Sequence, residues 1–334
     1  MIDITQEQIM EKWKIDNSEI PLVSIKCITY NHEKYIAQTL DGFLFQKTNF
    51  PFEIIVHDDA STDKTADIIR QYEEKYPKII KPIYETENQY SKHDGSVTRI
   101  VNAACKGKYI AICEGDDYWI NDNKLQMQID YLENNSDVGL VYTYSKVFYQ
   151  EENRIAKNKI GNPFISYEDV FINGNCVPTL TLCMRTELYK EYLQDIPFED
   201  KKNWKMGDLP LCLWFIKNSK IHLIPKVTAM YRVLSESASH SADNDKMVAF
   251  NQSIYDIRAY FAKKYDDMEL IEQFALSKKI DAAWKERKRE EFVSLYKGFH
   301  YPNKILKIKN LICTNNFLYK LFCLLKKNKS NKNI

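Results

Sequence analysis

The segment GKYIAICEGDDYWINDNKLQMQIDYL (residues 107–132) decides the fold. Its first part, KYIAIC (108–113), is a short apolar run typical of a buried strand, and residues 121–135 have the periodicity of an amphipathic helix. Three acids occupy four positions in the turn between them: Glu114, Asp116 and Asp117. Because like charges packed this closely repel, the turn needs open water, a helix N-terminus or a bound cation.

The same order of strand and helix occurs twice upstream. Apolar strands are predicted at 22–28 and 52–57, and each is followed by a helical pattern, at 33–46 and 61–76. A third strand, weakened by a proline, covers 79–84. Repeated units of this kind predict an α/β fold with a mixed, mostly parallel sheet flanked by helices.

The rest of the chain departs from this rhythm. The polar segment ETENQYSKHDGS (85–96) predicts a mobile loop, and a short helix follows at 99–107. After Val138, strand-like and helix-like segments alternate irregularly, which predicts an α+β second half that completes the same sheet. Residues from about 243 to 299 have a helical pattern throughout.

We therefore expect three parts in the chain. A helical lead-in covers residues 1–20, and an α/β domain covers 21–240. A helical C-terminal extension with a lysine-rich amphipathic end covers 241–334.

Composition is that of an ordinary globular protein, with 334 residues, 44% hydrophobic and 28% charged. Eight cysteines without a CxxC pair, several of them in apolar strands, indicate a reducing compartment rather than a disulfide scaffold. The polar N-terminus lacks the pattern of a signal peptide, and no run approaches 18 apolar residues. The expected localisation is cytoplasmic, and the net charge of +1 gives no preference for nucleic acid.

Positive charge is concentrated at the C-terminal end. Residues 301–334 contain eight Lys and no Asp or Glu, so the first 300 residues carry a net charge of −7. From residue 303 onward Ile, Leu and Phe alternate with Lys, as in a helix that lies on a membrane. We expect residues 303–334 to contact an anionic membrane surface, at the inner face of the plasma membrane; the alternative is a solvated helical extension.

Ligands of open α/β sheets bind beyond the carboxyl ends of the strands. Polar segments follow three predicted strands: ITYN (28–31), HDDASTD (57–63) and CEGDDYW (113–119). Several carboxylates with almost no His or Cys favour a hard cation such as Mg²⁺ or Mn²⁺, which keeps coordination sites for phosphates. Each segment alone is also compatible with a simple turn or helix cap, but the three in order favour a binding site.

Three segments resemble inverting glycosyltransferases of family 2, which have the GT-A fold: 23–46, 52–69 and 107–132. The resemblance covers roughly residues 21–240, and CEGDDYW is similar to bacterial enzymes that build surface polysaccharides. It implies a nucleotide-sugar donor, by family habit a UDP-sugar, and a saccharide or lipid-linked saccharide acceptor. The family's QxxRW motif is absent, which favours addition of a single sugar over polymer synthesis.

The resemblance assigns the nucleotide pocket to two of the loops. Ile28, Thr29 and Tyr30 match positions that line the base, with Tyr30 stacking on it. Asp58 matches the carboxylate that reads the base, and Asp59 stands beside it near the ribose.

The acidic turn matches the family's DxD-type metal motif. Asp116 is the position expected to bind Mn²⁺ or Mg²⁺ at the diphosphate. Glu114 replaces the more common first Asp and has a longer reach. Asp117 is expected either to contact the donor or only to cap the following helix.

The resemblance also implies a catalytic base at the start of a helix in the second half. Asp208, in NWKMGDLPLCLW, is our candidate, with Asp200 and Glu199 in reserve. Asp208 followed two residues later by Pro is equally a helix-cap signature, and one residue can do both.

Three further residues have weaker assignments from the resemblance. Arg232 is expected to touch the diphosphate, and His240 to complete the metal shell. Arg99 lies where related sequences place a basic residue near the donor. The alternatives are a surface or core role for His240 and a solvated side chain for Arg99.

Two other functional classes remain open at this point. A nucleotidyltransferase has a glycine-rich loop after its first strand, whereas the loop here, TYNHEKY, has no glycine, and no GxGxxG of a Rossmann oxidoreductase occurs. An inactive nucleotide-sugar-binding protein is disfavoured by the joint presence of Asp58, Asp116 and Asp208.

Overall fold

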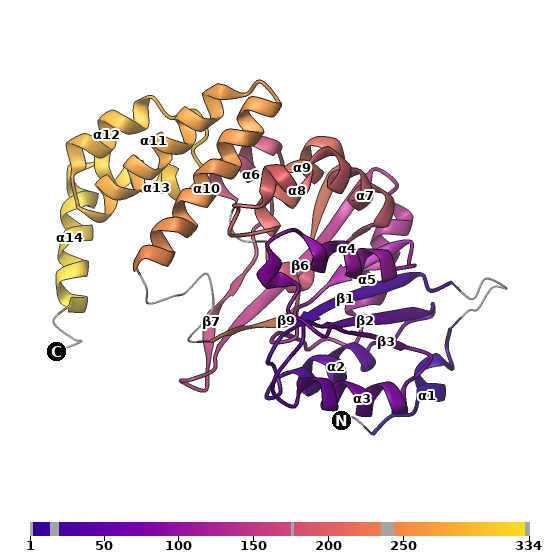
Figure 1. Cartoon of the computed structure of the whole chain (residues 1–334). Coiled ribbons are helices and arrows are strands. Elements are labelled where there is room, and N and C mark those ends of the chain that lie inside the picture. Colours follow the sequence, from indigo (N-terminus) through magenta and orange to yellow (C-terminus); the bar gives the residue numbers. More distant parts are fainter. Residues whose placement is uncertain (1–2, 14–19, 175–176, 235–243, 331–334) are drawn as a thin grey trace. The chain divides into compact units, whose positions relative to one another are not determined.

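The computed structural model describes residues 3–13, 20–174, 177–234 and 244–330, the last seven of these by backbone only (Figure 1). The described chain divides into two compact units. The first contains Met1–Ile165 with Gly174–Tyr255, and the second contains Ser166–Asn173 with Asp256–Ile334. The first unit is built on a sheet and the second is helical.

The sheet of the first unit contains nine strands within the described residues. Their order is β3 (Ile80–Tyr84), β2 (Phe52–Asp58), β1 (Val23–Thr29), β4 (Tyr109–Ile112), β8 (Cys183–Arg185), β6 (Val138–Tyr149), β9 (Lys220–Val233) and β5 (Tyr118–Trp119), with β7 (Arg154–Ile160) paired to β6. The ladders of β1 with β2 and β4, of β2 with β3 and of β6 with β9 are parallel. Most paired residues belong to these ladders, which confirms the expected mixed, mostly parallel sheet.

Helices cover both faces of the sheet. The bounds in this unit are α1 (Gln6–Met10), α2 (Ile36–Leu44), α3 (Thr65–Lys75), η1 (Tyr90–Lys92), α4 (Ser96–Ala104), α5 (Lys124–Asn134), η2 (Thr179–Thr181), α7 (Thr186–Asp195), α8 (Phe198–Lys201) and α9 (Asp208–Asn218). The side chains of Val23, Ile25 and Cys27 in β1 pack with α2, α3 and α5 in the main core. On the other face, Lys26 Nζ donates to Asn102 Oδ1 of α4 (2.9 Å).

The coverage of both faces of the sheet by helices explains why the first strands could be predicted. Successive side chains of a strand point to opposite faces, and burial on both faces requires a nearly continuous apolar run. The four strands predicted at 22–28, 52–57, 79–84 and 108–113 are confirmed as β1, β2, β3 and β4. Each parallel strand ends at the same edge of the sheet, so the polar segments after β1, β2 and β4 share that edge.

The second unit consists of helices in its described part. They are α6 (Tyr167–Asn173), the end of α10 (Asn244–Lys264), α11 (Met268–Lys285), α12 (Arg289–Lys297), α13 (Lys304–Thr314) and α14 (Asn316–Ser330). The buried Arg258 guanidinium lies 4.0 Å from the Phe274 ring centroid and donates to the Phe171 carbonyl. Among the described helices, none combines the length and the apolar character needed to cross a bilayer.

Candidate active site

The loops after β1 and β2 are interlocked at the carboxyl edge of the sheet. The Asn31 backbone N–H donates to Ser61 Oγ (2.9 Å), and Asn31 Oδ1 accepts from the Thr62 N–H (2.8 Å). The His32 N–H donates to Thr65 Oγ1 (2.8 Å). Asn31 has a left-handed backbone (φ 55°), a conformation that asparagine adopts more readily than most residues.

The acidic turn after β4 is hydrogen-bonded to the end of β1 and to α2. The Gly115 N–H donates to the Ile28 carbonyl (2.9 Å), and Thr39 Oγ1 donates to the Asp117 carbonyl (2.6 Å). A Cβ atom at Gly115 would lie 2.5 Å from Thr29 Oγ1, so the two loops approach more closely than a side chain permits. The three strand ends therefore meet in one place, as the sequence predicts.

This close approach gives a testable consequence for Gly115→Ala. The added methyl group would press on Thr29, which is buried and β-branched and cannot easily turn away. We expect the free energy of unfolding to fall by about 1–3 kcal/mol, measured by urea denaturation. Gly207→Ala is the matched control, because a Cβ there would meet nothing within 4 Å. Equal stability of the two variants would contradict the tight packing.

The three acids of the turn differ in their surroundings. Burial raises the pKa of Glu114 to about 7, and the negative charges of Asp116 and Asp208 add to the shift. Burial, Asp116 and Glu114 raise the pKa of Asp117, whose Oδ1 accepts from the Arg232 backbone N–H (2.7 Å). Asp116 is half-buried, and its carboxylate receives no hydrogen bond from the described residues. Asp116 therefore has carboxylate oxygen atoms available to a ligand.

The base candidate Asp208 is the first residue of α9. Its Oδ1 accepts from the Leu209 N–H (2.8 Å), and burial raises the pKa of its carboxyl group. The N-cap of α9 is Gly207, so the cap expected at Asp208 is wrong by one residue; the charge of Asp208 adds to the raised pKa of Glu114 in the acidic turn. Of the reserve residues, Glu199 is exposed and pairs with Lys202 (2.8 Å), and Asp200 lies on the four-residue helix α8.

The nucleotide-pocket candidates lie on the first two loops. Asp58 is 2% exposed, and its Oδ2 accepts a long hydrogen bond from the Ser61 N–H (3.4 Å). Its Oδ1 has no partner, and a buried acceptor without a donor costs free energy unless a ligand supplies one. Tyr30 is exposed, Ile28 is half-buried and Thr29 is buried beneath them.

Comparison with known proteins gives the family. Residues 24–193 match the profile described as Glycosyl transferase family 2. The chain belongs to this family. Membership of this family speaks against the nucleotidyltransferase alternative.

The chain is also similar to curated proteins and, in fold, to a solved structure. An uncharacterized protein of Mycobacterium tuberculosis is 33% identical over 228 residues, covering 67% of this chain and only 62% of the relative. The Escherichia coli protein WfaP, named UDP-Glc:alpha-D-GlcNAc-diphosphoundecaprenol beta-1,3-glucosyltransferase, is 30% identical over 183 residues, covering 55% of this chain and 68% of the relative. The mannosyltransferase PcManGT of Pyrobaculum calidifontis, solved with GDP-Man and Mn²⁺, shares the fold with a TM-score of 0.52 at 15% identity, over 94% of this chain and 91% of that one.

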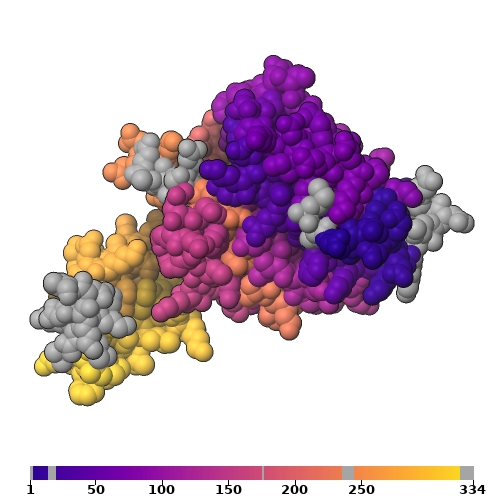
Figure 2. All heavy atoms as spheres, turned by 90° about the horizontal axis from the view of Figure 1, so that it is seen from below, coloured from indigo at the N-terminus to yellow at the C-terminus, as the bar shows by residue number. Residues whose placement is uncertain are grey.

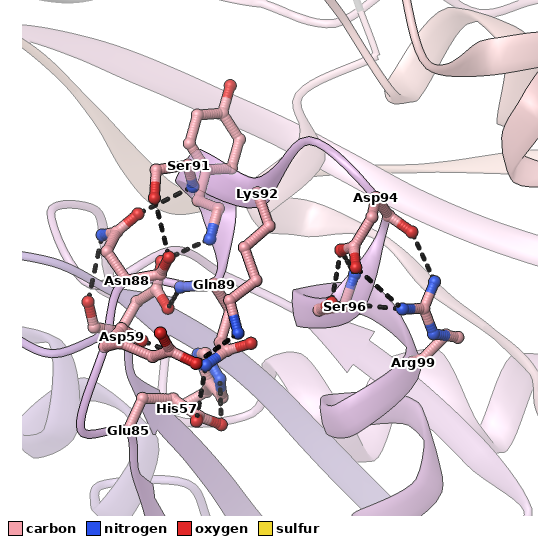
Figure 3. A network of polar contacts seen from close by, with 12 residues as sticks. His57, Asp59, Glu85, Asn88, Gln89, Ser91, Lys92, Asp94, Ser96 and Arg99 are labelled. Carbon is pink, nitrogen blue, oxygen red and sulfur yellow. Dashed lines mark hydrogen bonds and ion pairs between the residues drawn. The ribbon is translucent and has the colours of Figure 1, made fainter.

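Both carboxylate oxygens of Asp59 accept hydrogen bonds from backbone N–H groups. Its Oδ1 accepts from the Gln89 N–H (2.7 Å) and its Oδ2 from the Tyr90 N–H (3.0 Å) (Figure 3). The segment 85–96, which the sequence predicts to be a mobile loop, is thereby tied to the end of β2 and contains the 3₁₀ turn η1. Most of the segment lies outside regular structure, as expected, and its mobility stays a prediction; its polar composition gave no sign of the carboxylate that accepts two of its backbone N–H groups.

Arg99 and His240 are placed differently from the other candidates. Arg99 is exposed on α4, and its guanidinium lies 3.5 Å from Asp94 Oδ2 and donates to Ser96 Oγ (3.1 Å) (Figure 3). Its contacts are thus within its own segment. His240 lies outside the described residues.

Arg232 supports the acidic turn from inside the protein. It is 4% exposed, and its Nε donates to the Asp116 carbonyl (2.7 Å). Its other two guanidinium nitrogens donate to the side-chain oxygens of Gln38 (2.7 Å) and Gln150, and the Tyr35 ring centroid lies 4.7 Å away. The guanidinium is therefore engaged with protein oxygen atoms, not directed at an open site.

The donor set suits a hard divalent cation that is held together with a diphosphate. Among the described residues, no group of three or more His, Cys, Asp or Glu side chains could enclose a metal. Asp116 nevertheless offers carboxylate oxygens beside two further carboxyl groups, those of Glu114 and Asp117. A cation that keeps most of its coordination sites for phosphate and water needs few protein ligands.

His32, which no sequence motif singles out, lies against the acidic turn. A Cβ at Gly115 would lie 3.0 Å from His32 Nδ1, so the imidazole packs on the middle of the turn. Burial lowers the pKa of His32, and the Asp116 charge opposes this shift. The signal that could have identified it is its position in TYNHE, directly after β1.

Proposed function

We propose that the chain is an inverting glycosyltransferase that moves one sugar from a UDP-sugar to a hydroxyl group of a saccharide or lipid-linked saccharide. One observation carries the proposal. The charges of Asp116 and Asp208 both contribute to the raised pKa of Glu114, which supports a common location for the acid that would hold a cation and for the candidate base.

The donor half of the site would recognise the nucleotide. Asp58 Oδ1, buried and without a donor, would accept an N–H of the base, and the exposed Tyr30 ring would stack on it. Asp116 would hold Mn²⁺ or Mg²⁺ against the diphosphate; bound there, the cation would offset charge that develops on the departing nucleoside diphosphate.

The acceptor half depends on Asp208. In the deprotonated state it would accept the proton of the acceptor hydroxyl while that oxygen attacks the anomeric carbon from the face opposite the leaving group. Because no enzyme nucleophile takes part, the anomeric configuration would invert. General-base catalysis of this kind typically contributes about 10²–10⁴-fold.

The choice of UDP and of the acceptor class has its support in the relatives. WfaP, at 30% identity, is named for UDP-Glc and for a diphosphoundecaprenol-linked sugar. A Bacillus subtilis relative carries a putative role in teichuronic acid biosynthesis. We therefore propose a hexosyl- or N-acetylhexosaminyltransferase of bacterial surface-polysaccharide synthesis.

Thermal melting with UDP, dTDP, GDP and CMP, each with and without Mn²⁺, tests the donor assignment. We expect UDP with Mn²⁺ to raise the melting temperature by a few degrees, since a ligand at 100 times its dissociation constant adds about 2.7 kcal/mol. Asp116→Asn should remove the Mn²⁺-dependent part of the shift. Asp137→Asn, an exposed acid paired with Lys220, is the control and should retain it.

The other outcomes of this experiment are also decisive. If GDP and not UDP raised the melting temperature, the proposed donor would be a GDP-sugar and not a UDP-sugar. If no nucleotide changed the melting temperature with or without Mn²⁺, the nucleotide-site assignment would fail.

A further inference from the structure

Helix α13 exposes apolar side chains on the side opposite its packed face. Leu306 and Cys313 are buried within the second unit. Ile305, Ile308 and Leu311 are 66%, 51% and 58% exposed, and their spacing places them on one stripe of the helix, away from the buried residues. An exposed helical face is normally polar, so this stripe indicates an apolar partner.

Helix α14 continues the pattern after one intervening residue, Asn315. Its packed side is defined by the Tyr319 hydroxyl, which donates to the Arg287 carbonyl (2.9 Å), and by Phe322, whose ring centroid lies 4.7 Å from that of Trp284. Phe317 and Leu321, four residues apart, are exposed. Two successive helices therefore each have one packed and one exposed apolar side, and Figure 2 shows the yellow atoms of this C-terminal region at the surface of the protein.

The charged residues of α13 and α14 themselves are all lysines. Lys304, Lys307 and Lys320 are exposed beside the apolar side chains. Lys309 differs, because it pairs with Asp281 (3.0 Å). Since residues 301–334 contain eight Lys and no acid, the faces are complementary to an anionic surface.

We propose that α13 and α14 lie in the interface of an anionic lipid membrane. Ile305, Ile308, Leu311, Phe317 and Leu321 enter the boundary between headgroups and acyl chains, and the lysines contact anionic headgroups. A second copy of the chain fits less well, because two such faces would bring like charges together. A nucleic acid would use the lysines but leave the apolar stripe uncovered.

Flotation of the full chain with vesicles tests the proposal. We expect the protein to float with phosphatidylcholine vesicles that contain phosphatidylglycerol, less so at high salt, and not with phosphatidylcholine alone. Ile308→Asp and Leu311→Asp should each lower partitioning by at least about tenfold. Lys304→Gln and Lys307→Gln should each lower it by about fivefold.

Val248→Asp on α10 is the matched control, an exposed apolar helical position outside this region, and should float as the wild type does. Circular dichroism checks that each variant is folded. Unchanged flotation of Ile308→Asp, or equal binding of the wild type to both vesicle types, would overturn the proposal. The proposal would also be overturned if the wild type did not float but formed a concentration-dependent dimer that Ile308→Asp abolishes.

Discussion

Asp208→Asn is expected to lower the turnover of sugar transfer by about 10²–10⁴-fold while donor binding stays unchanged. The substitution keeps the shape of the side chain and its acceptor oxygen for the Leu209 N–H, so α9 keeps its start. The substitution removes the carboxylate that would take the proton from the hydroxyl group of the acceptor sugar. The loss should therefore lie in kcat and leave the UDP-induced melting shift as it is.

The pH dependence gives this prediction a second readout. Burial raises the pKa of Asp208 above the ordinary value for Asp. Because the base must be deprotonated, the rate should fall as the pH drops through this raised pKa. The Asn variant should lack this acidic limb of the pH–rate profile, since its residual rate does not depend on a titrating base at this position.

Initial rates of UDP release in the presence of acceptor, at several pH values, would check both points. Glu187→Gln, an exposed acid in the first turn of α7, is the matched control and should behave as the wild type. If Asp208→Asn kept its turnover, another group would have to take the proton. Loss of the UDP shift together with activity would instead indicate that Asp208 shapes the donor pocket.

The predictable part of the fold lies in buried, regular segments. β1 and β2 are buried along nearly their whole length, and most of their residues are apolar, as is typical of strands covered on both faces. β5, by contrast, has two residues and exists through its antiparallel pairing with β9, which no local pattern reveals. β7 (Arg154–Ile160) pairs with β6 and has mostly exposed side chains. It therefore lacks the apolar face from which a strand could be predicted.

The same limit applies to the candidate site. Sequence could place acids at strand ends, because the topology of parallel strands brings those ends together. It could not distinguish Asp58 from its neighbour Asp59, since only the folded chain shows that one carboxylate keeps an unpartnered oxygen and the other accepts two backbone N–H groups. The residue types predict where carboxylates lie close together, and the hydrogen bonds of the folded chain decide which of these carboxylates are available to a ligand.

Arg232→Met is expected to lower the free energy of unfolding by about 3–5 kcal/mol. The side chain is buried, and its guanidinium donates to the Asp116 carbonyl and to Gln38. Its positive charge also opposes the raised pKa of Asp117, a buried carboxyl group of the same turn. Removing the cation leaves these oxygen atoms without donors and Asp117 without its compensating charge.

Two further variants separate charge from packing. Arg232→Lys keeps the charge but cannot reach the same oxygens with a planar fork, so an intermediate loss is expected. Adding Asp117→Asn to Arg232→Met should recover part of the stability, because the uncompensated buried charge is gone. Arg70→Met is the control: Arg70 forms an exposed pair with Asp67 (2.7 Å), and pairs of this kind contribute about 0–1 kcal/mol.

Urea denaturation of the four variants, combined with UDP titration, decides between the two roles considered for Arg232. A large stability loss with partial recovery by Asp117→Asn identifies a residue that positions the acidic turn, and donor affinity should then fall only as the turn loosens. Unchanged stability with a sharp loss of UDP affinity would contradict this and would assign the guanidinium to the diphosphate. The buried position of Arg232 and its three protein acceptors favour the first result.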